Sequence, residues 1–151
     1  MRVFLVHHGD ALPADIEPAR PLSPRGLVAV QSLAEAAVAR TVKPVEIWHS
    51  GKLRARQTAE AFWQVCNPLA TVLAQRGLQP DDPAGIIADQ LGAEDRETLI
   101  VGHMPHLPAL LRWLVAGWDD PAIMFPQHGL VALERSANRL KWIERWRLEV
   151  E

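Results

Sequence analysis

The stretch Val3-Phe4-Leu5-Val6-His7-His8-Gly9-Asp10 introduces the pattern that organises the whole chain. An apolar run over residues 2–6 leads into two histidines and a glycine. A short, continuous apolar run that ends at a turn favours a buried strand over a helix. The histidines that follow are therefore expected at the carboxyl end of that strand.

The same pattern recurs along the chain, with helical segments between the apolar runs. Further strands are expected at residues 45–49, 71–74, 98–101, 130–134 and 141–148, and a proline-rich loop at 11–22. Helices are expected from Ser23-Pro24 onward, from Ser50 to about residue 65, over 82–91 and over 105–115. Serine is a favoured N-cap and proline a favoured first helical residue, so Ser23-Pro24 is typical of a helix start.

Apolar spacing predicts which faces of these elements are buried. In the first helix a stripe at helical spacing is formed by Leu27, Val30, Leu33, Ala34, Ala37 and Val38. The second helix is expected to be capped by Ser50 and to bury Leu53, Ala61 and Val65. In the last strand, alternation places Trp142 and Trp146 on one face.

Strands that alternate with helices predict an α/β fold, a three-layer αβα sandwich around a mostly parallel sheet. The two closing strands follow each other without a helix, so they are expected to add an antiparallel, mixed edge. The length of 151 residues is that of one domain, and we expect a single domain over 1–151.

Composition excludes several classes of protein. The formal net charge is −2 and hydrophobic residues make up 48% of the chain, which argues against a disordered or nucleic-acid-coating protein. The apolar run at 3–6 is too short for a membrane span or a signal peptide. The single cysteine, Cys66, has no partner for an internal disulfide. We therefore expect a cytoplasmic protein with no nucleic-acid or membrane partner.

Nitrogen-bearing side chains follow three of the expected strands. His8 follows the first strand, Arg54 lies shortly after the second, and His103 follows the strand at 98–101. In open α/β sheets, ligands bind beyond the carboxyl ends of the strands. Helix N-termini at the same edge favour an anion, and a phosphate group suits such donors.

Two other kinds of site are less consistent with the sequence. Zinc usually takes three or four convergent ligands, and neither His7-His8 nor His103-x-x-His106 has a known zinc spacing. No G-x-S-x-G, P-loop or G-x-G-x-x-G motif is present. We therefore expect no metal and no cofactor.

Four segments, in order along the chain, resemble the signature segments of the histidine phosphatase superfamily. They are Leu5-Val6-His7-His8-Gly9-Asp10-Ala11, Leu22-Ser23-Pro24-Arg25-Gly26, Ser50-Gly51-Lys52-Leu53-Arg54-Ala55-Arg56-Gln57-Thr58-Ala59 and Val101-Gly102-His103-Met104-Pro105. The short length and Arg20-Pro21-Leu22 are most similar to the SixA-type phosphohistidine phosphatases. The resemblance implies a phosphoglycerate mutase-like fold.

The resemblance also implies roles for individual residues. His8 is the expected nucleophile that takes the phosphoryl group, and Arg54 and His103 are expected to contact the same group. Arg20 is expected to add a phosphate contact. His7 stands where the family pattern has arginine, so we expect it to bind phosphate without the charge and the bidentate fork of arginine.

The chemistry sets requirements for the groups around the nucleophile. One ring nitrogen of His8 must be unprotonated, and the other must be fixed by an acceptor, for which a backbone carbonyl at the Gly9 turn is expected. Gly9 also allows close approach to phosphate. Asp81 and Asp82 are the nearest candidates for a general acid, and Asp82 is alternatively a helix cap.

Three other histidines are placed around this site. His106 is expected at the rim of the pocket, and His128 in a loop that covers it. His49 is expected to pack at the end of its strand.

The sequence thus predicts a metal-independent phosphohistidine phosphatase that transfers a phosphoryl group from a protein to His8 and then to water. One alternative is a small-molecule phosphomonoesterase. Another, motivated by His7, is a module that binds phosphate or a phosphoprotein with weakened or lost catalysis.

Overall fold

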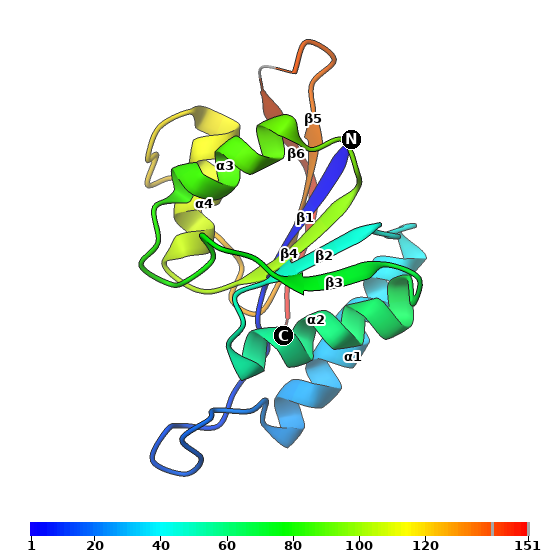
Figure 1. The fold of residues 1–151 in the computed structure, drawn as a ribbon, viewed down its shortest axis with the longest axis vertical. Coiled ribbons are helices and arrows are strands. Elements are labelled where there is room, and N and C mark those ends of the chain that lie inside the picture. Colours follow the sequence, from blue (N-terminus) through cyan, green and yellow to red (C-terminus); the bar gives the residue numbers. More distant parts are fainter. Residues whose placement is uncertain (140, 151) are drawn as a thin grey trace.

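The computed structural model describes residues 1–139 and 141–150, and its centre is one six-stranded sheet (Figure 1). The strand order is β3-β2-β4-β1-β5-β6. The strands are β1 (Arg2–His7), β2 (Glu46–His49), β3 (Thr71–Ala74), β4 (Thr98–Gly102), β5 (Leu130–Arg135) and β6 (Trp142–Leu148). The expected strands are all present, and each bound agrees with the expectation to within one residue.

The sheet is parallel except at one edge. β3, β2, β4 and β1 pair in parallel, and β1 pairs with β4 from Val3↔Thr98 to His7↔Gly102. β5 runs antiparallel to β1, and β6 runs antiparallel to β5. The predicted mixed edge is therefore confirmed.

Two pairs of helices cover the two faces of the sheet (Figure 1). α1 (Pro24–Ala39) and α2 (Leu53–Cys66) pack on one face, against Phe4, Val6 and other buried strand residues. α3 (Ala84–Ala93) and α4 (His106–Ala116) pack on the other, against Val3 and Leu5. Successive residues of β1 thus enter opposite cores, which explains its continuous apolar sequence. This is the predicted three-layer sandwich.

α1 begins as the sequence indicates. The Ser23 side chain caps it by accepting the backbone N–H of Gly26, and Pro24 is its first residue. The buried face consists of Gly26, Val30, Leu33, Ala34 and Ala37. The predicted stripe was too wide, because Leu27 and Val38 lie at its edges and are exposed.

The start of α2 differs from the prediction. Its N-cap is Lys52, and no side chain caps it, so Ser50 is not a helix cap. The side chains that α2 buries are Ala55, Thr58, Ala59, Phe62 and Cys66, while Leu53, Ala61 and Val65 are only partly buried. The helix is rotated relative to the prediction, so that Phe62 and Cys66 face the sheet together with the small residues Ala55 and Ala59.

α3 and α4 also begin slightly later than predicted. The N-cap of α3 is Pro83, and the Asp82 carboxylate instead accepts the backbone N–H of Gln79, so Asp82 does not cap the helix. α4 begins at His106 and ends at Gly117, whose φ of 81° is the left-handed conformation typical of a helix C-terminus.

The β5–β6 pair contains an irregularity that the sequence did not reveal. Its register shifts between Ala132, which pairs with Trp146, and Leu133, which pairs with Glu144. The shift reverses the alternation along β6. Trp142 therefore packs in the core on the α3–α4 face and Trp146 on the α1–α2 face, and the prediction that both share one face was wrong.

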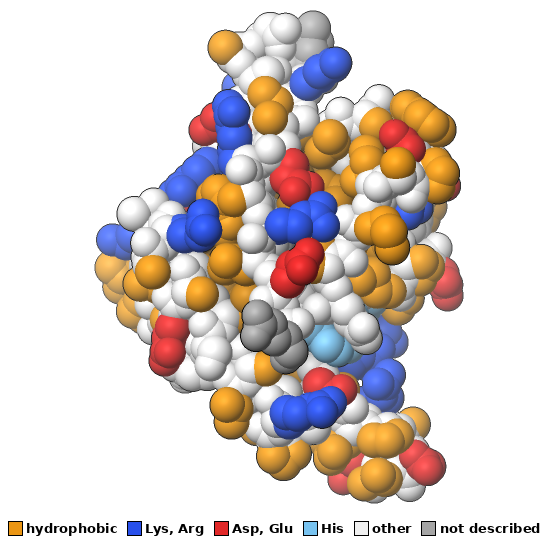
Figure 2. All heavy atoms as spheres, turned by 180° about the vertical axis from the view of Figure 1, so that it is seen from behind, with side chains coloured by type: hydrophobic (Ala, Val, Ile, Leu, Met, Phe, Trp, Pro, Cys, Tyr) orange, Lys and Arg blue, Asp and Glu red, His pale blue; other side chains and the backbone are white. Residues whose placement is uncertain are grey.

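The surface mixes charged and apolar side chains, as Figure 2 shows for one side of the molecule. Basic and acidic groups lie next to each other there, in agreement with ion pairs such as Arg145–Glu134 and Arg147–Glu144. Among the described residues, no helix has the length and apolar character needed to cross a bilayer.

Gly26 provides a test of how tightly the turn after β1 is packed. A Cβ at this position would collide with the backbone carbonyl of Asp10, two residues after His8. We expect Gly26→Ala to lower the free energy of unfolding by about 1–3 kcal/mol in urea denaturation. Gly92→Ala is the matched control, because Gly92 lies in α3 with open space around it and alanine favours helix by up to about 1 kcal/mol. Equal stability of the two variants would contradict the expectation.

Candidate active site

Backbone hydrogen bonds bring the ends of β1 and β4 and the start of β5 together. The N–H of His7 donates to the carbonyl of Gly129 at 3.0 Å, and that of His8 donates to the carbonyl of Gly102 at 3.2 Å. The His8 ring is 5.0 Å from that of His103, and 6.1 Å from that of His128, measured between ring centroids. The predicted convergence at the carboxyl edge of the sheet is therefore present.

The two ring nitrogens of His8 have different partners. Nδ1 lies 2.7 Å from the carbonyl oxygen of Gly9, which can only accept, so Nδ1 carries the proton. Nε2 then holds the lone pair, and the Nε–H of Arg54 points to it at 3.4 Å. Burial lowers the pKa of His8 to about 4, and the Arg54 charge adds to this although the Gly9 hydrogen bond opposes it. The ring is neutral at pH 7.

Gly9 is held by side chains on both sides. Its N–H donates to Thr58 Oγ1 at 3.1 Å, and the Thr58 hydroxyl donates to the carbonyl of Arg54 at 2.8 Å. A Cβ on Gly9 would collide with Val30. Because its N–H is already engaged, Gly9 contributes the carbonyl that orients His8 and not the direct phosphate contact that the sequence suggested.

His7 is fixed in the opposite tautomer. Its Nδ1 accepts the backbone N–H of His128 at 2.8 Å, so in the neutral ring the proton lies on Nε2. The ring stacks on that of His128, with centroids 4.7 Å apart and planes 4° from parallel. Burial lowers the pKa of His7 to about 3, with a further contribution from neighbouring His8. His7 is thus an uncharged N–H donor.

His103 is oriented by Ser50, which follows β2. The Ser50 hydroxyl lies 2.6 Å from Nε2 of His103 and accepts the backbone N–H of Lys52 at 3.3 Å. A hydroxyl can donate one hydrogen bond and accept two, so this contact fixes the His103 ring without deciding which ring nitrogen carries the proton. The other ring nitrogen, Nδ1, is buried without a hydrogen-bond partner among the described residues. Burial lowers the pKa of His103 to about 3, so the ring is a second neutral imidazole.

His128 completes the group from the loop before β5. Its Nδ1 lies 2.7 Å from the carbonyl oxygen of His8, so Nδ1 carries the proton and Nε2 the lone pair. Its φ of 55° is in the left-handed region, which is uncommon outside glycine. The expectation that His128 lies over the site agrees with this position.

Two arginines supply the positive charge. Arg54 is at the first turn of α2, and burial lowers its pKa, with a contribution from the charge of Arg20. The charge of Arg20 also contributes to the lowered pKa of His8, after burial and the charge of Arg54. Its Nε–H donates to the carbonyl of Leu12 at 3.0 Å, and its φ is 49°.

Three candidates lie outside this group. His106 is 2% exposed, and it lines a separate hollow with Asp82 and Arg112 instead of the predicted rim of the pocket around His8. His49 is buried, and its Nδ1 accepts the N–H of Gly51. Asp82 is near enough to His106 to favour its protonated form.

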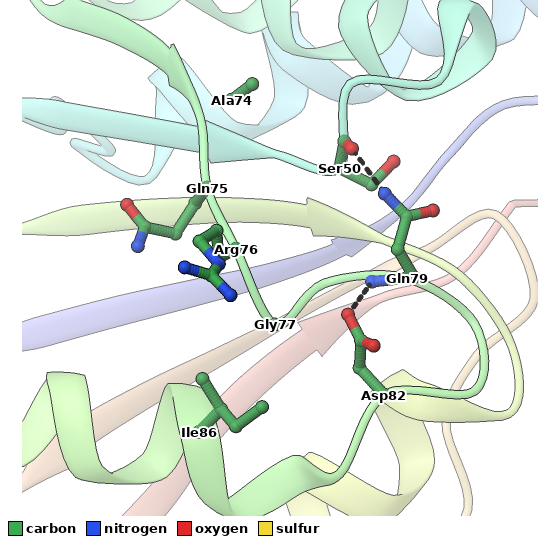
Figure 3. A pocket seen from close by; sticks show the side chains of 8 residues that line it. All are labelled: Ser50, Ala74, Gln75, Arg76, Gly77, Gln79, Asp82 and Ile86. Carbon is green, nitrogen blue, oxygen red and sulfur yellow. Dashed lines mark hydrogen bonds between the residues drawn. The ribbon is translucent and has the colours of Figure 1, made fainter.

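A polar hollow of about 370 Å³ opens beside Ser50 (Figure 3). Gln79 lies across it and donates to the backbone carbonyl of Ser50 at 2.7 Å. Asp82 and Arg76 lie around the same hollow. Asp82 is therefore connected to the backbone of Ser50 through Gln79, which donates hydrogen bonds to both. No hydrogen bond joins Asp82 to His8 among the described residues.

The rings of His7, His8 and His128 are close enough to suggest a metal site, since one nitrogen of each lies within 4.8 Å of the others. The hydrogen bonds do not fit such a site. The lone pair of His7 is occupied by the N–H of His128, so His7 offers none to a cation. Two imidazoles remain, fewer than the three or four ligands that zinc usually takes.

Solved structures resemble this one over nearly the whole chain. A protein histidine phosphatase SixA, solved with tungstate, has a TM-score of 0.85 and 25% identity over 99% of this chain and 97% of its own. The chain has the fold of the histidine phosphatases. A protein of Agrobacterium tumefaciens described as a SixA phosphohistidine phosphatase gives 0.80 and 22% over 97% and 96%.

More distant histidine phosphatases share the same architecture. A mycobacterial glucosyl-3-phosphoglycerate phosphatase, in complex with VO₃, gives a TM-score of 0.72 at 16% identity over 99% of both chains. No protein-family model matches the sequence, and no curated protein gives a significant sequence match. The likeness therefore rests on the structure, and it is greatest in the SixA-type histidine phosphatases among the proteins compared above.

Sequence reasoning missed Ser50 and Thr58 as parts of this site. Ser50 follows a strand, as His8 and His103 do, and that position was a usable signal. Thr58 lies four residues after Arg54, one helical turn away, but the prediction of the buried face of α2 omitted it. Both hydroxyls act through other residues, by orienting His103 and Gly9 respectively.

The Ser50 hydroxyl gives a spectroscopic prediction. In Ser50→Ala the hydroxyl that contacts Nε2 of His103 is lost, so we expect the populations of the two imidazole tautomers to change. Nitrogen-15 chemical shifts of the imidazole distinguish the two tautomers, and Ser32→Ala removes an exposed hydroxyl as a control. Unchanged tautomer populations in Ser50→Ala would show that Ser50 does not set them.

Proposed function

We propose that this chain, as a single histidine phosphatase domain over 1–151, is a phosphohistidine phosphatase that acts through His8. One observation carries the proposal. The lone pair of His8 is fixed on Nε2 by the Gly9 carbonyl and lies 3.4 Å from Arg54, among neutral N–H donors. Such a group is an unprotonated nucleophile beside a phosphate-binding cation. The likeness to SixA at a TM-score of 0.85 supports the same class.

In the first step, Nε2 of His8 attacks phosphorus and the bond to the leaving group breaks. The electron pair leaves with that group, and a phosphorus–nitrogen bond forms on His8. Nδ1–H remains bonded to Gly9, so the positive charge that develops on the ring is stabilised by a carbonyl. Water then attacks phosphorus, the phosphorus–nitrogen bond breaks, and His8 regains its lone pair.

Charge on the transferred group is balanced by a small number of donors. Arg54 provides a cation, and Arg20 adds a second, while His7 provides an uncharged N–H group and His103 a neutral imidazole. Donors that are already oriented stabilise the transition state without reorganisation. We propose that these residues suffice and that the reaction needs no metal ion.

A phosphohistidine on a protein is the substrate that this site suits best. No carboxylate among the residues that the structure describes forms a hydrogen bond with His7, His8, His103 or His128. Asp82, the expected acid, is bonded to Gln79 instead. A phosphoramidate makes least demand on a general acid, because imidazole leaves more readily than an alkoxide. A histidine of a cytoplasmic phosphotransfer protein is a fitting source.

The polar hollow beside Ser50 supports a second candidate function. Its lining by Arg76, Gln79 and Asp82 is also suited to the polar group of a small phosphate monoester. A phosphate-binding module without turnover is the third reading, and it rests on His7 in place of arginine. Formation of a phosphorylated intermediate distinguishes the two candidate phosphatase functions from a phosphate-binding module without turnover.

The test of the proposed function is to trap the intermediate. After brief incubation with a phosphorylated histidine protein in EDTA, we expect an acid-labile phosphoryl group on the wild-type chain and none on His8→Ala. His49→Ala, which removes a structural imidazole, is the control and should still be labelled. Phosphate binding without any label would leave only the binding module, and loss of label in EDTA would refute metal independence.

His7 makes a second prediction. Replacement by arginine adds a charged donor, which is worth about 1.5–3 kcal/mol. We therefore expect His7→Arg to raise turnover of a small phosphorylated substrate by roughly tenfold to 150-fold. His7→Gln, a neutral donor of similar reach, should not raise it. Steady-state kinetics of the three proteins decide, and unchanged or lower turnover in folded His7→Arg would show that the native histidine is no weaker than arginine.

A further inference from the structure

Hydrogen bonds fix the proton positions of three of the four imidazoles at the active site. His7 presents N–H at Nε2, whereas His8 and His128 hold lone pairs at Nε2. The lone pair of His8 faces Arg54 and is used by the proposed nucleophilic attack. The Nε2 lone pair of His128 has no hydrogen-bond donor among the described residues.

His128 is close to the nucleophile and firmly held. One of its ring nitrogens lies within 4.8 Å of a ring nitrogen of His8. The stack on His7 and the hydrogen bond to the carbonyl of His8 fix the ring plane. A left-handed φ in a residue other than glycine costs energy and is often found at functional sites.

The nearby carboxylates are engaged elsewhere. Asp10 accepts the Ser23 hydroxyl at 2.7 Å and lies 3.8 Å from Arg25. Asp82 accepts the N–H of Gln79 at 2.8 Å. These are the acidic side chains closest to the site in sequence or in the two hollows around it. The usual alternative base, a carboxylate, is thus absent from the hydrogen-bonding network of the four imidazoles in the described chain.

We propose that His128 is the general base of the second half-reaction; the proposal rests on the phosphatase function given above. The water oxygen forms a bond to phosphorus as the bond from phosphorus to Nε2 of His8 breaks. The bonding pair returns to Nε2 of His8, and the proton of the water passes to Nε2 of His128. Inorganic phosphate, neutral His8 and a protonated His128 result, so atoms and charge balance.

The surroundings allow His128 to accept and release that proton. Its Nδ1–H already donates to a carbonyl, an arrangement that is kept when the ring becomes an imidazolium. His128 also lines a hollow of about 340 Å³ with Gly9, Asp10, Arg25 and Gln127. Solvent in the hollow provides the exit for the proton.

The experiment isolates the second step with para-nitrophenyl phosphate, whose phenolate leaves without a proton. For the wild-type chain we expect turnover that depends on His8. In His128→Asn, asparagine tolerates the left-handed backbone and keeps the backbone N–H that donates to His7. For this variant we expect the same initial burst of nitrophenolate as for the wild-type chain. Steady-state turnover should fall by about 10²-fold or more, with phosphoenzyme accumulating on His8.

Controls separate this proposal from a structural effect and from the proposed function. Gln127→Ala alters the same hollow and should leave both phases unchanged, and vanadate affinity reports whether His128→Asn keeps the site intact. Wild-type turnover in His128→Asn, or an equal loss of burst and steady state with vanadate binding kept, overturns the role of His128 alone. Turnover that persists in His8→Ala overturns the proposed function and this inference with it.

Discussion

The hydrogen bond from Nδ1 of His8 to the carbonyl of Gly9, at 2.7 Å, determines which nitrogen of the ring is free. A histidine with the proton on its other nitrogen would present N–H where a lone pair is needed. The turn that provides this carbonyl is fixed from behind, because the N–H of Gly9 is bonded to Thr58 of α2 and α1 leaves no room for a Cβ. The packing of both helices on one face of the sheet thus reaches the nucleophile through a single peptide group.

The imidazoles of the site are neutral. Burial and mutual proximity lower the pKa of His7, His8 and His103 to about 3 or 4, so these rings are neutral near pH 7. The nucleophilic role proposed for His8 requires this neutrality, which is favoured by the same cation, Arg54, that faces its lone pair. Burial and the guanidinium therefore act in the same direction.

The sequence predicted the parts of the site that follow from the topology of the sheet. His8, Arg54 and His103 were identified because each follows a parallel strand, and the carboxyl ends of parallel strands meet at one edge. Ser50 was assigned to a helix cap, because its partner is 53 residues away and only the fold brings them together. The face of α2 and the register shift that separates Trp142 from Trp146 depend on tertiary packing, which periodicity does not contain.

The antiparallel edge has a consequence for the chemistry as well as for the sheet. Since β5 runs opposite to β1, with Val6 paired to Leu130, the loop before β5 lies beside the end of β1. That loop carries His128, whose N–H fixes the tautomer of His7 and whose ring stacks on that of His7, 6.1 Å from the His8 ring. A parallel strand in this place would begin at the opposite edge and bring its preceding loop there. The reversal of one strand thus adds an imidazole from residue 128 to groups supplied by residues 8, 54 and 103.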